Sequence, residues 1–413
     1  MEDLQKLREQ ILAFNIDPDY AHLQSYYKKK SFFNVLGVSR DENRHSAFLH
    51  WLLSPDESHG LGDYALRCLL GLIVLVKNEQ RAKNGELHFP KDYAENGNLE
   101  DAITCGRYTL DQIVCKREMQ IPAGRIDVFL SFEFQTNKTR CLQIILENKV
   151  KAKEGKEQTD RYYEYGKNTE DRESLYLFLS PLSNAEFKEH PLNCKCKKFI
   201  GLNYQYLVDC VLEPCLMQCR EEDAKSFIEE YLRTLSQPSF EYDDIENAEI
   251  IMAVCKKERE LLRRFWERNK AILMAVLKDS KKTELLRCFW ESNRTLLVAA
   301  LRALTDDLTI EEEDRREIRH GLKSILKGEQ AQKIRTYILE IMKEAVARRE
   351  DSVEIRVSDC PKGKNNSPLV CNILKRFQRK EYGDWNTQTK NEKEVSSAII
   401  FTYHKLSERN DLK

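Results

Sequence analysis

A change of hydrophobic period in the middle of the chain restricts the fold more than any other feature of the sequence. Four short segments there are rich in β-forming residues and are bounded by turn residues: 116–121, 125–132, 142–150 and 175–179. Before the last of them, residues 154–165 have the apolar spacing of a helix. A helix that crosses between two strands makes that pair parallel. The pattern therefore predicts an α/β fold with a small mixed sheet surrounded by helices.

Helical spacing of apolar residues characterises both sides of this predicted sheet. It extends over residues 1 to about 112 and returns from about residue 242, where the chain is highly charged. In the second region residues 261–269 recur as residues 285–293, with an offset of 24. Two copies are too few for a solenoid. We expect a pair of helices that either braces the fold or binds a partner.

Composition and charge exclude several classes of protein. The 67 basic and 68 acidic residues give a net charge of -1, which excludes a protein that coats DNA with a basic surface but not an enzyme with one local groove. No apolar run approaches the roughly 18 residues of a membrane span, and residues 1–14 lack the apolar core of a secretory signal. We expect the thirteen cysteines to be free thiols, in a cytoplasmic protein with no membrane partner.

Three charged residues interrupt the apolar strands. Asp127 lies in the second strand, and Glu147 and Lys149 lie in the third, where alternation points both to one face. Charge at the border of a core is costly unless it is paired or binds metal. Carboxylates with water are ligands that suit Mg²⁺ and Mn²⁺. The sequence therefore predicts a Mg²⁺ (or Mn²⁺) site at Asp127 and Glu147.

Such a site has the parts that phosphodiester hydrolysis requires. A divalent metal polarises the phosphate and lowers the pKa of a bound water. Lys149 can hold the water or the phosphate by its charge, whereas its ordinary pKa of about 10.4 makes it a poor base. We assign Lys149 orientation and charge stabilisation first and general-base catalysis second.

The spacing of these residues resembles that of the PD-(D/E)XK nuclease superfamily. Gly124-x-x-Asp127, followed by Glu147-x-Lys149, is similar to its RecB-like branch. The resemblance covers about residues 30 to 180. It departs from the common pattern at Ile126, where many members have proline, and the superfamily tolerates this change widely.

Further residues on both sides fit the same resemblance. The RecB-like branch carries a Q-x-x-x-Y motif, which Gln158 and Tyr162 match on one helical face. The upstream E-x-x-H-S block is similar too, and it implies that Glu42 assists the metal site. His45 in this block has two open interpretations. It is either a ligand or general acid, or a structural histidine that bonds to a helix end or backbone.

Basic residues near the predicted metal site are candidates for contact with nucleic acid: Arg125, Lys151, Lys153 and Lys156. A run of lysines beside a metal site can follow a phosphate backbone. A solvated turn between strand and helix explains any single lysine after Lys149 equally well. The aromatic and basic residues of 26–33 suit base stacking, and a helix end packed on the core explains them as well.

The resemblance implies a restriction-endonuclease-like fold: a mixed central sheet flanked by helices, with an appended, mainly helical C-terminal region. The implied function is Mg-dependent hydrolysis of phosphodiester bonds in nucleic acid, with DNA favoured and bacterial defence or DNA processing as the setting. Gln158 and Tyr162 would support the catalytic residues. One alternative is an inactive nuclease fold that binds nucleic acid. Another is an interaction protein whose helices around Trp266 and Trp290 dock a partner or a second copy of the chain.

We divide the chain accordingly into three predicted parts. These are residues 1–240 as the nuclease domain, 241–357 as a helical region with tandem helices at 258–277 and 282–301, and 358–413 as a linker and C-terminal segment. The linker, 358–368, holds two prolines, a glycine and two asparagines. After it, residues 398–403 read as a strand.

Overall fold

The computed structural model describes most of the chain. The described residues are 2–81, 83–90, 98–122, 124–150, 154–169, 171–190, 192, 194–237, 251–361, 369–374, 385–389, 399–404 and 406. They form two compact units. The first comprises Met1–Ser239, Glu249–Leu273 and Phe289–Arg315, and the second comprises Phe240–Ala248, Met274–Cys288 and Arg316–Lys413.

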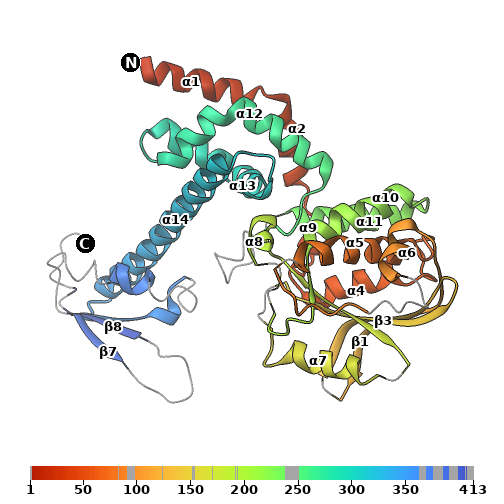
Figure 1. The fold of residues 1–413 in the computed structure, drawn as a ribbon. Coiled ribbons are helices and arrows are strands. Elements are labelled where there is room, and N and C mark those ends of the chain that lie inside the picture. The colour runs from red at the N-terminus through yellow and green to blue at the C-terminus, as the bar shows by residue number, and fades with distance from the viewer. Residues whose placement is uncertain are drawn as a thin grey trace. The chain divides into compact units, whose positions relative to one another are not determined.

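A five-stranded mixed sheet forms the centre of the first unit (Figure 1). In spatial order its strands are β1 (Thr109–Ile121), β2 (Gly124–Gln135), β3 (Thr139–Asn148), β4 (Glu173–Ser180) and β5 (Ile200–Asn203). The first three pair antiparallel, whereas β3 with β4 and β4 with β5 pair parallel. Helix α7 (Gln158–Lys167) crosses between β3 and β4, which makes that pair parallel. The predicted mixed sheet flanked by helices is confirmed.

Helices cover both faces of this sheet. Besides α7, the described helices up to residue 236 are, in the order of the sequence, α1 (Glu2–Asn15), α2 (Pro18–Lys28), α3 (Phe32–Val35), α4 (Glu42–Leu53), α5 (Tyr64–Arg81), α6 (Leu99–Cys105), α8 (Asn184–Glu189), α9 (Tyr204–Leu207), the π-helical turn Val208–Leu212, α10 (Glu213–Gln218) and α11 (Glu222–Ser236). Alternating residues of β2, such as Val128 and Leu130, pack with α4 and α5, and Phe129 packs with Tyr162 of α7. Figure 1 shows α7 on the opposite side of the sheet from α4 and α5.

One helix and one strand of the first unit differ from the sequence expectation. Helix α7 begins at Gln158 rather than at residue 154, because Glu157 has a φ of 52°, which a right-handed helix cannot continue. Strand β5 has only four residues, with Gly201 among them, and carries too short a pattern to be recognised.

The tandem repeat contributes to two long helices, α12 (Lys256–Asp279) and α13 (Glu284–Asp306). Equivalent residues of the two copies hold the N-terminal helices within the first unit. The ring of Phe14 lies 5.5 Å from that of Phe265 and 4.8 Å from that of Phe289. The equivalent residues Asn269 and Asn293 bond to Asp17 and Tyr20, respectively. The repeat therefore braces α1 and α2.

The tryptophans of the repeat are core residues. Trp266 and Trp290 are each only 4% exposed. Their side chains are thus not available on the surface, and the docking of a partner by the helices around them stays a prediction. The predicted bracing role fits the observed packing.

The second unit holds most of the long helix α14 (Glu312–Ala347) and a three-stranded antiparallel sheet. The strands are β6 (Ser352–Arg356), β7 (Trp385–Thr389) and β8 (Ile399–His404), in the order β6-β8-β7, with a 3-10 turn at Val357–Asp359. Ile334, Ile338 and Met342 of α14 form its core with Ile355 and Leu406.

The predicted strand at 398–403 coincides with β8, and residues 362–368 of the predicted linker lie outside the described residues. No helix in the described part of the chain is long and apolar enough to span a membrane.

Candidate active site

Asp127 and Glu147 meet where β2 and β3 stop pairing. The last pair between these strands is Val128 with Leu146, and the next step along each strand holds Asp127 and Glu147. The backbone N–H of Asn148 donates to Oδ2 of Asp127 at 2.8 Å, which fixes this carboxylate against the end of β3. The structure therefore brings together the two carboxylates that the sequence proposes as metal ligands.

Glu147 is buried without the bonds that a buried carboxylate requires. Its side chain is 0% exposed, and its Oε2 has no hydrogen-bond partner among the described residues. One ion pair is present, because Nζ of Lys149 lies 2.5 Å from Oε1. Burial, followed by the neighbouring charge of Asp127, raises the pKa of Glu147 to about 8. Within the described part of the chain, Oε2 is thus a buried acceptor without a donor.

Asp127 shares this electrostatic environment. Burial raises its pKa to about 6, although the N–H of Asn148 and the charge of Lys149 act in the opposite direction. Two adjacent carboxylates with raised pKa values repel each other and favour a bound cation. A pair of this kind is more typical of a functional site than of a structural ion pair.

Lys149 is held between two carboxylates. Its backbone N–H donates to the carbonyl of Leu179 at 2.9 Å, so it continues the pairing of β3 with β4. Its Nζ lies 3.5 Å from Oε2 of Glu42 and 2.5 Å from Oε1 of Glu147. Burial disfavours its charge, but these carboxylates and Asp127 outweigh burial and raise the pKa of Lys149. Lys149 is therefore an ammonium group, which agrees with a role in orientation rather than as a base.

Glu42 reaches the site from the start of α4. Asp41 caps this helix by accepting from the N–H of Asn43, and Glu42 is the first helical residue. Oε1 of Glu42 accepts from the N–H of Val150 at 3.0 Å, while Oε2 faces Lys149. Glu42 thus ties α4 to the end of β3 and lies beside Lys149, at the edge of the site.

Asn148, which lies between the two residues of the motif, is a positioning residue that the sequence interpretation missed. It is fully buried, and its side chain donates to the carbonyl of Glu42 and to Oγ of Ser46. It also accepts from the hydroxyl of Tyr204 at 2.6 Å. Asn148 therefore joins β3 to α4 and α9. The available signal was an amide in a strand that is otherwise apolar.

Gln158 and Tyr162 act on the beginning of β2. Nε2 of Gln158 donates to the hydroxyl of Tyr162 at 3.0 Å, and this hydroxyl donates to the carbonyl of Arg125 at 2.5 Å. Tyr162 is only 1% exposed. The pair fixes α7 to the strand that carries Asp127, which suits the supporting role expected for the motif.

His45 belongs to the scaffold behind the site. It is fully buried, and its two ring nitrogens bond to the hydroxyl of Tyr231 at 2.9 Å and the carbonyl of Ser39 at 3.0 Å. Burial lowers its pKa to about 4, so the ring is neutral near pH 7. The geometry favours the structural alternative for His45.

The basic residues proposed to contact nucleic acid have different surroundings. Arg125 is exposed and forms an ion pair with Glu118 at 2.7 Å. Lys156 is exposed at the turn before α7. Lys151 and Lys153 lie outside the described residues. Tyr26 and Tyr27 of the aromatic and basic segment bond to Ser236 and Glu258, so these two rings pack inward.

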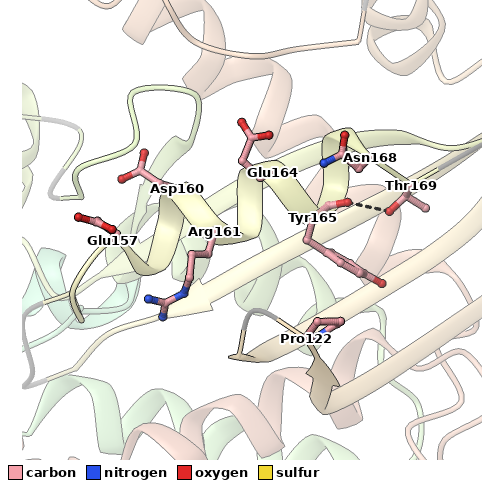
Figure 2. A pocket seen from close by; sticks show the side chains of 8 residues that line it. All are labelled: Pro122, Glu157, Asp160, Arg161, Glu164, Tyr165, Asn168 and Thr169. Atoms are coloured by element: carbon pink, nitrogen blue, oxygen red, sulfur yellow. Dashed lines mark hydrogen bonds between the residues drawn. The ribbon is translucent and has the colours of Figure 1, made fainter.

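A hollow of about 700 Å³ lies along α7 (Figure 2). Its lining residues are Pro122, Glu157, Asp160, Arg161, Glu164, Tyr165, Asn168 and Thr169. Three of them are acidic and one is basic, so this surface repels phosphate groups. We therefore do not place the path of a nucleic acid here.

Comparison with known proteins gives one match. Residues 30–233 match the family model of the PD-(D/E)XK nuclease superfamily. This segment contains all five strands of the first sheet and each of the site residues described above. The match identifies the superfamily and no branch within it. Neither the curated proteins nor the solved structures gave a match.

Proposed function

Residues 30–233 belong to the PD-(D/E)XK nuclease superfamily, and on this premise we propose that the chain is a divalent-metal-dependent nuclease that hydrolyses phosphodiester bonds, with DNA as the favoured substrate. One observation carries the proposal. Glu147 is fully buried beside Asp127, and its Oε2 has no hydrogen-bond partner among the residues that the structure describes. A buried carboxylate oxygen without a partner is costly unless a cation or a proton satisfies it.

The donors at this site fit Mg²⁺ or Mn²⁺. Within the described residues no group of three or more His, Cys, Asp or Glu could form a cage that holds a metal ion. Mg²⁺ does not require such a cage, because it is commonly held by one or two carboxylates together with water and substrate phosphates. Asp127 and Glu147 would hold the cation, and Glu42 is near enough to Lys149 to assist.

The other residues of the site have separate roles in the proposed reaction. When bound, the cation would supply Lewis-acid polarisation of the phosphate and a water of lowered pKa. Lys149 keeps its proton and presents its charge to the attacking water or the phosphate. Asn148 and Tyr162 hold the strands that carry the two carboxylates. Arg125 and Lys156 are exposed and available to the phosphate backbone.

The biological setting that we propose, bacterial defence or DNA processing, follows from fold analogy alone. The activity itself is directly testable. Purified chain is incubated with DNA and RNA in the presence of Mg²⁺ or Mn²⁺, and cleavage by the wild type is compared with that by Glu147→Gln and Lys149→Met. Glu133→Gln serves as a matched control, because Glu133 lies on β2 near the end opposite Asp127.

We expect Glu147→Gln and Lys149→Met to lower the rate about a hundredfold or more, because each removes charge from the reacting centre. Glu133→Gln should cut like the wild type. Equal cleavage by all four proteins would contradict the assignment of the site. Tight binding of nucleic acid without cleavage of any substrate would instead support the alternative of an inactive binding module.

A further inference from the structure

The segment from the end of α2 to α3 places basic and apolar side chains together on the surface. Residues 28–30 are three consecutive lysines, and all three are exposed. In α3 and the residue after it, the side chains of Phe32, Val35 and Leu36 are 61%, 67% and 57% exposed, respectively. Exposed apolar side chains that gather in one place are typical of a binding surface.

The backbone of this segment is held from behind by buried polar groups. The side chain of Gln237, which is only 5% exposed, donates to the carbonyl of Lys29 and accepts from the N–H of Ser31 at 3.2 Å. Ser31 in turn caps α3 by accepting from the N–H of Asn34. The exposed side chains are therefore carried on a backbone that is already fixed, which lowers the cost of ordering them on a ligand.

The segment lies beside the helix that begins at the proposed active site. The ring of Phe33 lies 6.2 Å from the ring of His45 on α4. His45 stands about one helical turn after Glu42, and Oε2 of Glu42 faces Lys149 at 3.5 Å. The segment is thus a neighbour of the helix end that contributes a carboxylate to the site.

The charge of the segment is available to a ligand. Among the described residues, the lysines 28–30 form no ion pair. Glu230 contacts the segment, where its Oε2 accepts from the N–H of Phe32 at 3.1 Å, but its carboxylate is also paired with Arg233. Three uncompensated positive charges beside an exposed ring attract a polyanion.

An aromatic ring next to lysines fits single-stranded nucleic acid better than a duplex. The bases of a single strand offer their π-faces to aromatic side chains, while basic side chains follow the phosphates. In a duplex the bases stack on one another and present only their edges in the grooves. Phe32 is the ring that fits this use, because Tyr26 and Tyr27 bond inward to Ser236 and Glu258.

We propose that the lysines 28–30 and Phe32 bind an unpaired stretch of the nucleic-acid substrate, with one base stacked on the ring of Phe32 and phosphates beside the lysines. The inference rests on the proposed function, because it names the substrate class of the same nuclease. That class is nucleic acid with a single-stranded segment near the bond that is cut.

The test measures binding of the full chain to a fluorescent single-stranded DNA oligonucleotide and to the same sequence as a blunt duplex, without divalent metal so that no cleavage occurs. Phe32→Leu keeps the apolar side chain and removes the ring. We expect it to weaken single-strand binding about tenfold and to leave duplex binding unchanged. Phe32→Trp keeps a stacking ring and should bind the single strand at least as tightly as the wild type does.

Val35→Ala is the matched control for the ring, because Val35 is an exposed apolar residue of the same short helix. It should bind single strands within about twofold of the wild type, since an aliphatic side chain offers no ring to a base. A surface that docks a protein through apolar contact would instead lose as much in Val35→Ala as in Phe32→Leu.

The lysines are tested through the salt dependence of binding. The double variant Lys28→Gln with Lys30→Gln should reduce the slope of log affinity against log salt by about 0.7 for each lysine that contacts a phosphate. Lys167→Gln is the control, because Lys167 is an exposed lysine at the end of α7, across the sheet from α4 (Figure 1). Its slope should equal that of the wild type.

The outcomes separate this inference from the proposed function. Wild-type affinity of Phe32→Leu for the single strand, or an equal loss in Val35→Ala, would overturn the stacking role while leaving the nuclease proposal in place. Binding to phosphatidylserine vesicles that depends on Phe32, without binding to single strands, would also overturn it and assign the surface to lipid. Single-strand binding that depends on Phe32, in a chain that cuts no nucleic acid with Mg²⁺ or Mn²⁺, would keep the surface and reject the nuclease.

Discussion

Two regions of the first unit place carboxylates in or beside the core, and these carboxylates have different hydrogen-bond partners. In the region braced by the repeat, Asp17 accepts from Asn269 at 2.7 Å, and Asp19 accepts from Arg264 and Arg268 at 3.0–3.3 Å. Where β2 begins and β3 ends, Asp127 accepts from the N–H of Asn148 at 2.8 Å. Among the described residues, Oε2 of Glu147 has no hydrogen-bond partner and its Oε1 pairs with Lys149.

The difference separates structural from functional charge. Buried carboxylates with several donors stabilise the packing of helices, since removing a donor leaves a buried charge alone. A buried carboxylate oxygen without a donor, such as Oε2 of Glu147, costs stability in the free protein and is suited to bind a cation. The predictions that follow are ordered by size and test this distinction.

The largest effect on stability is expected at Asn148, whose buried side chain forms hydrogen bonds to Glu42, Ser46 and Tyr204. Asn148→Ala should lower the free energy of unfolding by about 2–4 kcal/mol, because it leaves the buried hydroxyl of Tyr204 and Oγ of Ser46 without this partner. Tyr204→Phe removes one of these bonds and should cost about 1 kcal/mol. Urea unfolding measures both. A loss in Asn148→Ala no larger than that in Tyr204→Phe would contradict its role in joining three elements.

Charge-removing variants in the two regions should have opposite signs. Asp17→Asn should lower the free energy of unfolding by about 1–2 kcal/mol, because Asp17 caps α2 and accepts from Asn269. Glu147→Gln should raise it by at least about 1 kcal/mol at pH 9 in the absence of divalent metal. Denaturant titrations measure the free energy of unfolding of both variants. A lower free energy of unfolding in both would contradict the proposed difference between structural and functional carboxylates.

The stabilisation in Glu147→Gln should depend on pH. The folded protein raises the pKa of Glu147 to about 8 from an ordinary value of 4.5, so it binds this proton more tightly than the unfolded chain does. The contribution of Glu147 to stability is therefore fully present below about pH 4.5 and is lost as the pH rises to about 8. The advantage of the variant over the wild type should grow across this window. An advantage independent of pH would contradict the assignment.

The sequence predicted the parts of the site that follow from local pattern. Asp127, Glu147 and Lys149 converge because strand alternation and the helix crossover specify their positions, and the family model confirms the superfamily that the motif spacing predicts. The surroundings of His45 depend on Tyr231, which is 186 residues away in the sequence. Long-range contacts of this kind are outside what periodicity can show.

Glu258 is the residue that could contradict this comparison. It lies in the braced region, and yet only one of its carboxylate oxygens has a hydrogen-bond partner among the described residues. Its Oε1 accepts from the hydroxyl of Tyr27 at 2.6 Å, its Oε2 has no hydrogen-bond partner, and burial raises its pKa to about 7. We expect Glu258→Gln to leave Mn²⁺ affinity and cleavage within about twofold of the wild type, since Glu258 lies outside the proposed cation site and its Oε1 already accepts from Tyr27. Calorimetry and a cleavage assay test this, and a large loss of Mn²⁺ binding would show that isolated burial is sufficient to create a cation site.

The central claim is that Asp127 and Glu147 share one divalent cation. A crystal structure of the full chain soaked in Mn²⁺, with anomalous data, tests it most directly. The account predicts an anomalous peak about 2.0–2.3 Å from one oxygen of each of these two side chains. A chain that binds Mn²⁺ elsewhere, or that leaves both carboxylates without a metal at saturating Mn²⁺, would contradict it.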